Sequence, residues 1–227
     1  LLRLVDDYAP QNVSDKVLTR NKLGLSSNHF VFCCFNNAYK ITPEIFSSWM
    51  RILHKTEESQ LWLLANNDMT IENLKNEAVK QGISDTRLVF APYVNLSEHL
   101  NRIKHADLFL DTRPYNAHTT SSDALRMGLP VLTCIGKSFP SRVAASILNS
   151  VNLPELITET EKEYESLAIE LATNPIKLKS IKNKLIDNLP TAPLFDTPLF
   201  TRKLESAYQT MYDKHHKGMK PEHIYVD

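Results

Sequence analysis

Residues 107–134 read DLFLDTRPYNAHTTSSDALRMGLPVLTC, and this stretch decides the fold class. A short apolar run at 108–110 leads into a polar loop that ends at His118–Thr120, where we expect a helix to begin. A second apolar run at 131–134 follows a Gly-Leu-Pro turn. The pattern predicts a strand–loop–helix–strand unit, and the backbone N–H groups and hydroxyls at its helix start can bind an anion.

Two further residues extend this anion site. Asp123 lies four residues after Thr119, about one helical turn further along, where a carboxylate can accept hydrogen bonds from a ribose diol. Lys40 follows an apolar run at 30–35, at the sheet edge where ligands usually bind, and its ammonium group can neutralise a diphosphate. The residues indicate a nucleoside diphosphate site without a Gly-rich loop. Helix capping by Thr119 or Thr120, a surface position for Lys40 and a helix-dipole role for Asp123 are the alternatives.

The composition narrows the class of protein. The chain has 227 residues, enough for one large or two small domains, and its 26 basic residues balance its 26 acidic residues. This balance argues against a nucleic-acid-binding protein that depends on bulk positive charge. Three cysteines, an odd number, fit buried thiols in a reducing compartment. No apolar run approaches the length of a membrane span and no signal peptide is visible, so we expect a cytoplasmic protein without a membrane partner.

Apolar runs alternate with helical patterns along most of the chain. The run Phe30–Phe35 is continuous, as is typical of strands buried on both faces. Thr42 and Pro43 form an N-cap and first-turn pair, and Gly82 ends a later helix. The alternation predicts an α/β fold with a Rossmann-like parallel sheet and flanking helices. Strands are expected at 30–35, 61–65, 87–90, 107–110 and 131–134, and helices at 43–54, 70–81, 97–104, after 118 and at 141–148.

The same pattern divides the chain into four parts. Residues 1–28 are a lead-in segment, 29–155 form the Rossmann-like lobe, 156–216 supply C-terminal helices that pack on this lobe, and 217–227 are a polar tail. Within the third part, helices are expected at 160–173, 175–189 and 197–216.

Six short segments follow one another along the chain in an informative order: CFNNAYKI at 34–41, SEHLNR at 97–102, DTRPYNAHTT at 111–120, SRVAAS at 141–146, PLF at 193–195 and KGMKP at 217–221. Together they resemble the C-terminal half of the catalytic region of the O-linked N-acetylglucosamine transferase family. This family includes the plant Spindly-type proteins and many bacterial relatives. The similarity extends over most of the chain, from about residue 30 to about residue 221.

This resemblance implies a two-lobed GT-B glycosyltransferase in which the chain is the second, nucleotide-sugar-binding lobe. The first lobe of the family carries a histidine proposed as catalytic base, and tetratricopeptide repeats precede it. Neither has a counterpart in this sequence. The missing lobe, the repeats and a protein acceptor are therefore the expected partners, and the chain alone is expected to bind nucleotide but to be inactive.

The resemblance also implies which residues bind the nucleotide. Asn37 and Lys40 match the family's diphosphate-binding pair, although the family often has glutamine at the first position. His99 and Arg102 match residues around the base; they lie three apart on a predicted helix and share a face, so a solvated surface pair is the alternative. A lysine common three residues before that histidine is Leu96 here, which leaves the preference for uridine open.

The helix start is implied to serve both binding and catalysis. By resemblance, His118, Thr119 and Thr120 hold the diphosphate and, with Lys40, stabilise its charge as it departs. Tyr115 lies where some family members have a small side chain near the N-acetyl group of the sugar. It is therefore a candidate for the sugar pocket, and a tyrosine there would narrow the space.

The acidic residues do not indicate a metal site. Asp123 matches the family's ribose-binding acid. Asp107 and Asp111 are four apart across a strand and are not the close pair that chelates a nucleotide-bound metal ion. We expect no metal ion and no other cofactor, in agreement with the metal-independent chemistry of the family.

The function implied by the resemblance is one half of an inverting protein O-glycosyltransferase. The expected reaction transfers N-acetylglucosamine from UDP-GlcNAc to serine or threonine of a protein. Two alternatives stay open: transfer of another sugar such as fucose or glucose, and a catalytically silent nucleotide-binding or scaffolding module. An unrelated nucleotide-binding protein such as a sugar epimerase is a weaker alternative, because no GxGxxG fingerprint is present.

Overall fold

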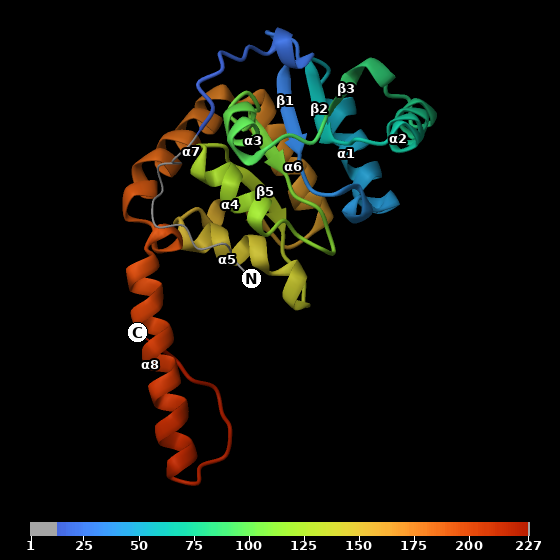
Figure 1. Ribbon diagram of the computed structural model, residues 1–227. Helices are drawn as coiled ribbons and strands as arrows, with labels where there is room; N and C mark the ends of the chain where they lie inside the picture. Colours follow the sequence, from blue (N-terminus) through green and yellow to red (C-terminus); the bar gives the residue numbers. More distant parts are fainter. Residues whose placement is uncertain (1–12, 227) are drawn as a thin grey trace.

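The computed structural model describes residues 13–226 and contains a six-stranded sheet (Figure 1). The strand order is β3-β2-β1-β4-β5-β6, so the order reverses between β1 and β4. Every strand pair is parallel, and β1, β2 and β5 are almost wholly buried. The predicted α/β class with a Rossmann-like sheet is confirmed. The strands are β1 (Phe30–Cys34), β2 (Ser59–Leu64), β3 (Leu88–Ala91), β4 (Leu108–Leu110), β5 (Val131–Cys134) and β6 (Ile157–Thr158).

The helices begin where the sequence supplies caps. The side chain of Thr42 accepts from the backbone N–H of Ile45, with Pro43 in the first turn, and a complete capping box at Thr160 opens a later helix. The described helices are α1 (Pro43–Lys55), α2 (Asp68–Lys80), α3 (Leu96–Ile103), α4 (Thr119–Arg126), α5 (Val143–Ser150), α6 (Glu161–Thr173), α7 (Pro175–Asn188) and α8 (Thr197–His216).

A chain of buried aromatic side chains ties two helices to the centre of the sheet. Trp49 on α1 donates from Nε1 to the hydroxyl of Tyr164 on α6, at 3.1 Å. That hydroxyl donates to the carbonyl of Asp111, just after β4, at 3.0 Å. Since Trp49 and Tyr164 are fully buried, α1 and α6 fix the end of β4, where the candidate site begins.

The described part of the lead-in segment is bonded to the sheet at the amino ends of β1 and β4, on the side away from the candidate site. Arg20 donates to Asp107 at 2.7 Å and to the carbonyls of His29 and His105, each at 3.0 Å. Lys182 of α7 also bonds Asp107, at 3.3 Å. Asp107 therefore organises the amino end of β4, at the opposite end of the strand from the candidate site. Residues 1–12 lie outside the described part.

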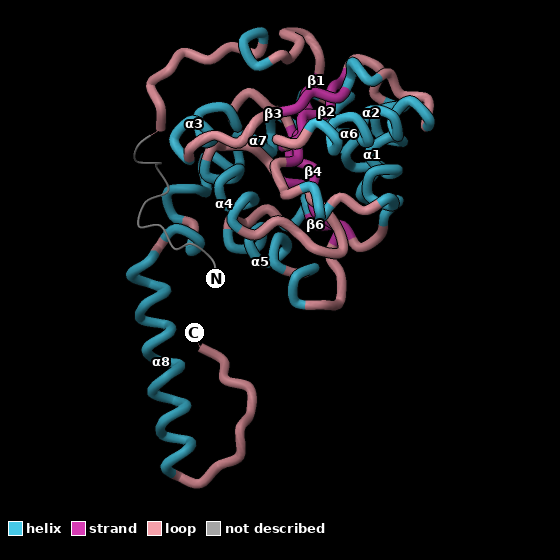
Figure 2. The backbone as a smooth tube through the Cα atoms, turned by 45° about the vertical axis from the view of Figure 1, so that its right-hand side comes forward, coloured by secondary structure: helices cyan, strands magenta, loops and turns pink. Residues whose placement is uncertain are grey.

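Two features of the C-terminal part differ from expectation. β6 was not predicted: it pairs with β5, so the sheet continues beyond residue 155. A strand of two residues carries no periodic signal, which is why sequence patterns miss it. The predicted helix at 197–216 forms, but α8 has no buried residue and projects from the lobe (Figures 1 and 2). Of the three helices predicted for this part, α6 and α7 are the ones that bury residues against the lobe. Within 13–226 we find no helix long and apolar enough to cross a membrane.

Candidate functional site

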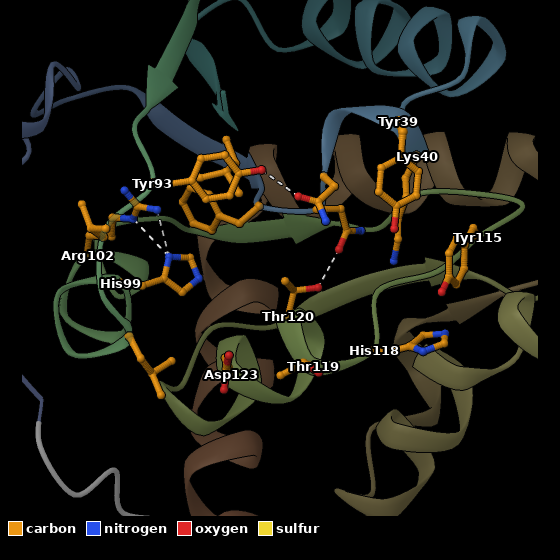
Figure 3. Close-up of a pocket in the computed structure, with 16 residues that line it drawn as sticks. Tyr39, Lys40, Tyr93, His99, Arg102, Tyr115, His118, Thr119, Thr120 and Asp123 are labelled. Atoms are coloured by element: carbon orange, nitrogen blue, oxygen red, sulfur yellow. Dashed lines mark hydrogen bonds between the residues drawn. The ribbon is translucent and has the colours of Figure 1, made fainter. Parts of the chain in front are cut away.

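The carboxyl ends of the strands border a cleft of about 520 Å³ next to the β1–β4 switch point, where ligands bind in open α/β sheets. Strand ends, the loops after β1, β3 and β4, and the helices α3 and α4 line it (Figure 3). Every residue that the sequence singled out for donor binding or for the sugar pocket lies on its wall. These are Asn37, Lys40, Tyr115, His99, Arg102, His118, Thr119, Thr120 and Asp123.

Lys40 is held at one end of the cleft by the loop after β4. Its Nζ donates to the carbonyl of Asn116 at 2.9 Å and lies 3.9 Å from the centre of the Tyr115 ring. Burial lowers the pKa of Lys40, while the nearby Asp111 and Cys34 raise it. An ammonium group has three N–H donors, so Lys40 can still donate to an anionic ligand.

The start of α4 forms the floor of the cleft. His118 is its N-cap residue, and its side chain makes no capping hydrogen bond. Thr120 donates from its hydroxyl to Asn36 Oδ1 at 2.5 Å instead of capping the helix. The first backbone N–H groups of α4 therefore lack a side-chain cap, which suits an anion such as phosphate. Asp123 lies one turn further along the same wall.

His99 and Arg102 form a rigid pair at the other end. Arg102 donates to His99 Nδ1 from Nε at 3.1 Å and from Nη2 at 3.0 Å, and it donates to the carbonyl of Pro92 at 2.6 Å. Since arginine can only donate, Nδ1 of His99 must accept, and its proton resides on Nε2. Burial, and then the charge of Arg102, lower the pKa of His99 to about 4. His99 is thus a neutral N–H donor near neutral pH, and the alternative of a solvated surface pair fails because Arg102 is 4% exposed.

The structure adds two residues that the sequence reasoning missed. Tyr93 donates from its hydroxyl to Asn37 Oδ1 at 2.7 Å, across the cleft from β3 to β1 (Figure 3). Asn36 is buried and bonds Thr120. Both follow the carboxyl end of a strand, the same signal that indicated Lys40, so that rule could have found them.

Aromatic rings gather around the Lys40 end. The Tyr115 ring lies 5.3 Å from that of His118 and 6.5 Å from that of Tyr39, and the His118 ring lies 6.3 Å from that of Phe139. Burial, with the charge of Lys40, lowers the pKa of His118. His118 is therefore a neutral ring among aromatic neighbours at neutral pH, on a surface suited to the apolar face of a sugar ring.

The cleft can bind an elongated anion. One end offers a neutral imidazole and a guanidinium near Phe35, the middle offers a helix start with hydroxyls, and the far end offers an ammonium group and aromatic rings. Across residues 13–226, no group of three or more histidine, cysteine or acidic side chains could hold a metal ion. Electrostatic chemistry by amines, hydroxyls and the helix start is what these residues supply.

Comparisons with known proteins agree with this geometry. A family model described as Glycosyl transferase family 41 matches residues 7–204. The UDP-N-acetylglucosamine–peptide N-acetylglucosaminyltransferase of Caenorhabditis elegans is 34% identical over 91% of the chain and 18% of its own length. The SEC protein of Arabidopsis thaliana, named as a probable enzyme of that kind, is 34% identical over 98% of the chain and 23% of its own length. The chain thus spans less than a quarter of these relatives.

Solved structures lead to the same fold. A mutant O-GlcNAc transferase of Thermobaculum terrenum superposes with a TM-score of 0.77 at 31% identity, over 84% of this chain and 38% of that one. The glycosyltransferase WaaG of lipopolysaccharide biosynthesis superposes with a TM-score of 0.60 at 17% identity, over 82% of this chain and 49% of that one. The second similarity concerns the fold alone.

Proposed function

The chain belongs to glycosyl transferase family 41, and from that premise we propose that it is the nucleotide-sugar-binding half of an inverting protein O-glycosyltransferase. The donor is UDP-GlcNAc and the acceptor is a serine or threonine hydroxyl of a protein. The names of the relatives support UDP-GlcNAc as the donor and O-linked transfer to a peptide. The partners are a first lobe with tetratricopeptide repeats, supplied by sequence outside this chain, and the protein acceptor.

One observation carries this proposal: Lys40 and the uncapped start of α4 face the same cleft at the switch point of the sheet. A diphosphate placed between them receives an ammonium group and backbone N–H donors. The base then lies toward His99 and Arg102, and the ribose toward Asp123. The sugar lies toward Tyr115, beside Lys40 (Figure 3).

This placement defines the chemistry of the lobe. The acceptor oxygen attacks the anomeric carbon from the face opposite the diphosphate, a new C–O bond forms, and the bond to the diphosphate oxygen breaks with inversion. Negative charge develops on the departing UDP, where Lys40 and the start of α4, at His118–Thr120, stabilise it. The proton of the acceptor hydroxyl goes to a base on the missing first lobe.

The organisation and location of the protein follow the same proposal. We assign residues 29–155, extended by β6 at residues 157–158, to the donor lobe, the remaining residues up to 216 to C-terminal helices, and 217–227 to a tail. Cys33, Cys34 and Cys134 are free and buried, which suits a reducing compartment, and we place the protein in the cytoplasm.

Transfer of a different sugar is the second candidate, and Tyr115 favours it. Tyr115 lines the cleft, and its ring contacts Lys40, so it narrows the space at the sugar end. A sugar without the N-acetyl group would need less room there. Competition between UDP-GlcNAc and UDP-glucose distinguishes the two donors.

Calorimetric titration of the chain with UDP, GDP and their sugars tests the proposal. We expect UDP to bind, and Lys40→Ala to weaken binding by roughly 10-fold or more, as for a lost charge-assisted hydrogen bond. Lys137→Ala is the matched control, because Lys137 is exposed, follows β5 at the same sheet edge and does not line the cleft. Preferential binding of GDP would mean that the site recognises guanine instead of uracil. No binding of any nucleotide by the folded chain would refute a donor lobe.

A further inference from the structure

A buried carboxylate lies beneath the cleft without lining it. Asp111 follows β4 and is 1% exposed. Its Oδ1 accepts from the backbone N–H groups of Thr112 at 2.8 Å and Ala117 at 2.6 Å, and its Oδ2 accepts from the Thr133 hydroxyl at 2.6 Å. Every one of these partners donates, so the arrangement fits an ionised carboxylate that holds both ends of the loop between β4 and α4.

The same carboxylate orients a side chain at the start of α4. Asn36 donates from Nδ2 to Asp111 Oδ1 at 3.3 Å and to the Thr112 hydroxyl at 2.8 Å. With its NH₂ group directed to these acceptors, the carbonyl of Asn36 faces Thr120 and accepts a hydrogen bond from its hydroxyl. Asp111 thereby fixes the rotamer of Thr120 through one intermediate residue.

Lys40 is connected to Asp111 through the loop. The backbone carbonyl of Asn116 accepts a hydrogen bond from Lys40. The side-chain Nδ2 of Asn116 donates to the carbonyl of Thr112 at 2.8 Å. Asn116 is fully buried, so its position depends on the loop that Asp111 holds. The helix start and the lysine, which the proposed function assigns to the diphosphate, therefore share one buried anchor.

We propose that Asp111 is the positioning residue of the donor site: it holds residues 112–118 and Thr120 in place and is the counter-charge that keeps Lys40 cationic. This inference rests on the proposed function. Asp111 acts through other groups and does not touch the nucleotide. Its counterpart Asp107, at the other end of β4, bonds Arg20 and Lys182 and serves as a matched control.

The groups that face Lys40 support a counter-charge role. Asp111 and Cys34 act on Lys40 electrostatically, Lys40 acts on His118 in the same way, and the Tyr115 ring lies 3.9 Å from Lys40 Nζ. Burial lowers the pKa of Lys40, and Asp111 and Cys34 oppose this effect. Burial also raises the pKa of the Cys34 thiol, which stays uncharged, and the pKa of His118 is lowered. Asp111 is then the anion that offsets the burial of Lys40.

Besides its hydrogen-bond partners, Asp111 interacts electrostatically with Lys40, Cys34 and Tyr164. Burial raises the pKa of Asp111 to about 7, while its hydrogen bonds and Lys40 oppose the rise. Burial raises the pKa of Tyr164, which stays a neutral phenol. Asp111 is thus charged above neutral pH. Its charge is therefore present on the alkaline side, where it opposes the loss of the Lys40 proton.

The test is UDP affinity as a function of pH, for the wild type, Asp111→Asn, Asp107→Asn and Lys40→Met. The wild type should lose affinity on the alkaline side as Lys40 deprotonates, and Lys40→Met should lack this alkaline loss. Removal of the Asp111 charge lowers the pKa of Lys40, so in Asp111→Asn the loss should occur about one pH unit lower. Amide exchange at Thr112 and Ala117 should also quicken. Asp107→Asn should leave the pH profile unchanged.

An unchanged alkaline profile in Asp111→Asn would overturn the inference and leave the proposed function intact. If Asp111→Asn does not fold, the wild type and Lys40→Met suffice. The Ala117 amide resonance should then follow the titration of Asp111, with a midpoint that rises in Lys40→Met because a positive neighbour is lost; an unmoved midpoint overturns the inference. If the wild type binds no nucleotide, the proposed function fails, and the role of Asp111 fails with it.

Discussion

Replacing His99 with glutamine tests the arrangement at the base end of the cleft. In the wild type, Arg102 donates to Nδ1 of His99 and excludes a proton from that atom. A glutamine carbonyl can accept from Arg102 in the same way but cannot titrate. The variant therefore keeps the hydrogen bond and removes only the coupling between protonation and folding.

The sign and size of the pH effect on stability follow from the pKa of His99, which burial and Arg102 lower from 6.5 to about 4. Between these pH values the unfolded chain binds a proton on His99 and the folded protein does not, so acid favours unfolding. The stabilising contribution is complete above pH 6.5 and is lost as the pH falls toward 4. At about 1.4 kcal/mol per pKa unit, the wild type should lose about 2 to 3 kcal/mol through His99 between pH 7 and about pH 4.5.

Urea unfolding of both proteins at several pH values measures this effect. Other groups titrate alike in the two proteins, so the difference between their free energies of unfolding isolates His99. His54→Gln is a control, because His54 is exposed. If the difference between wild type and His99→Gln does not change with pH, Nδ1 is not the acceptor we infer, and a donated hydrogen bond from Nε2 to the base has no support.

Three further outcomes are expected. Tyr93→Phe removes the hydrogen bond to Asn37 and should weaken UDP binding by a few-fold, by calorimetry, since a neutral bond contributes about 1 kcal/mol; unchanged affinity would show that Asn37 needs no partner. Trp49→Leu removes the buried hydrogen bond to Tyr164 and leaves a cavity, so the free energy of unfolding should fall by about 3 kcal/mol. A loss below about 1 kcal/mol would contradict this packing role of Trp49. Asp123→Asn should reduce the preference for UDP over 2′-deoxy-UDP, measured by competition, because the carboxylate is placed at the ribose; an unaltered preference would remove Asp123 from the ribose site.

Long-range contacts explain what sequence reasoning missed. Asn36 and Asp111 are 75 residues apart, and Tyr93 and Asn37 are 56 residues apart. No local sequence pattern predicts a contact between such distant residues, although each residue follows a strand. α8 shows the converse: its helical pattern predicts the helix correctly, but whether a helix packs depends on what lies opposite it, and no residue of α8 is buried.

The sequence by itself determined the alternation of strands and helices, the parallel sheet and the helix that starts at His118–Thr120, because periodicity, caps and strand ends are local properties of the chain. It also determined that the candidate residues would meet, since the carboxyl ends of parallel strands share one edge. Only the tertiary structure decided how those residues are oriented. Asp111 became a buried anchor and His99 a neutral donor because burial and partners distant in sequence set their charge, and these arise only when the chain is folded.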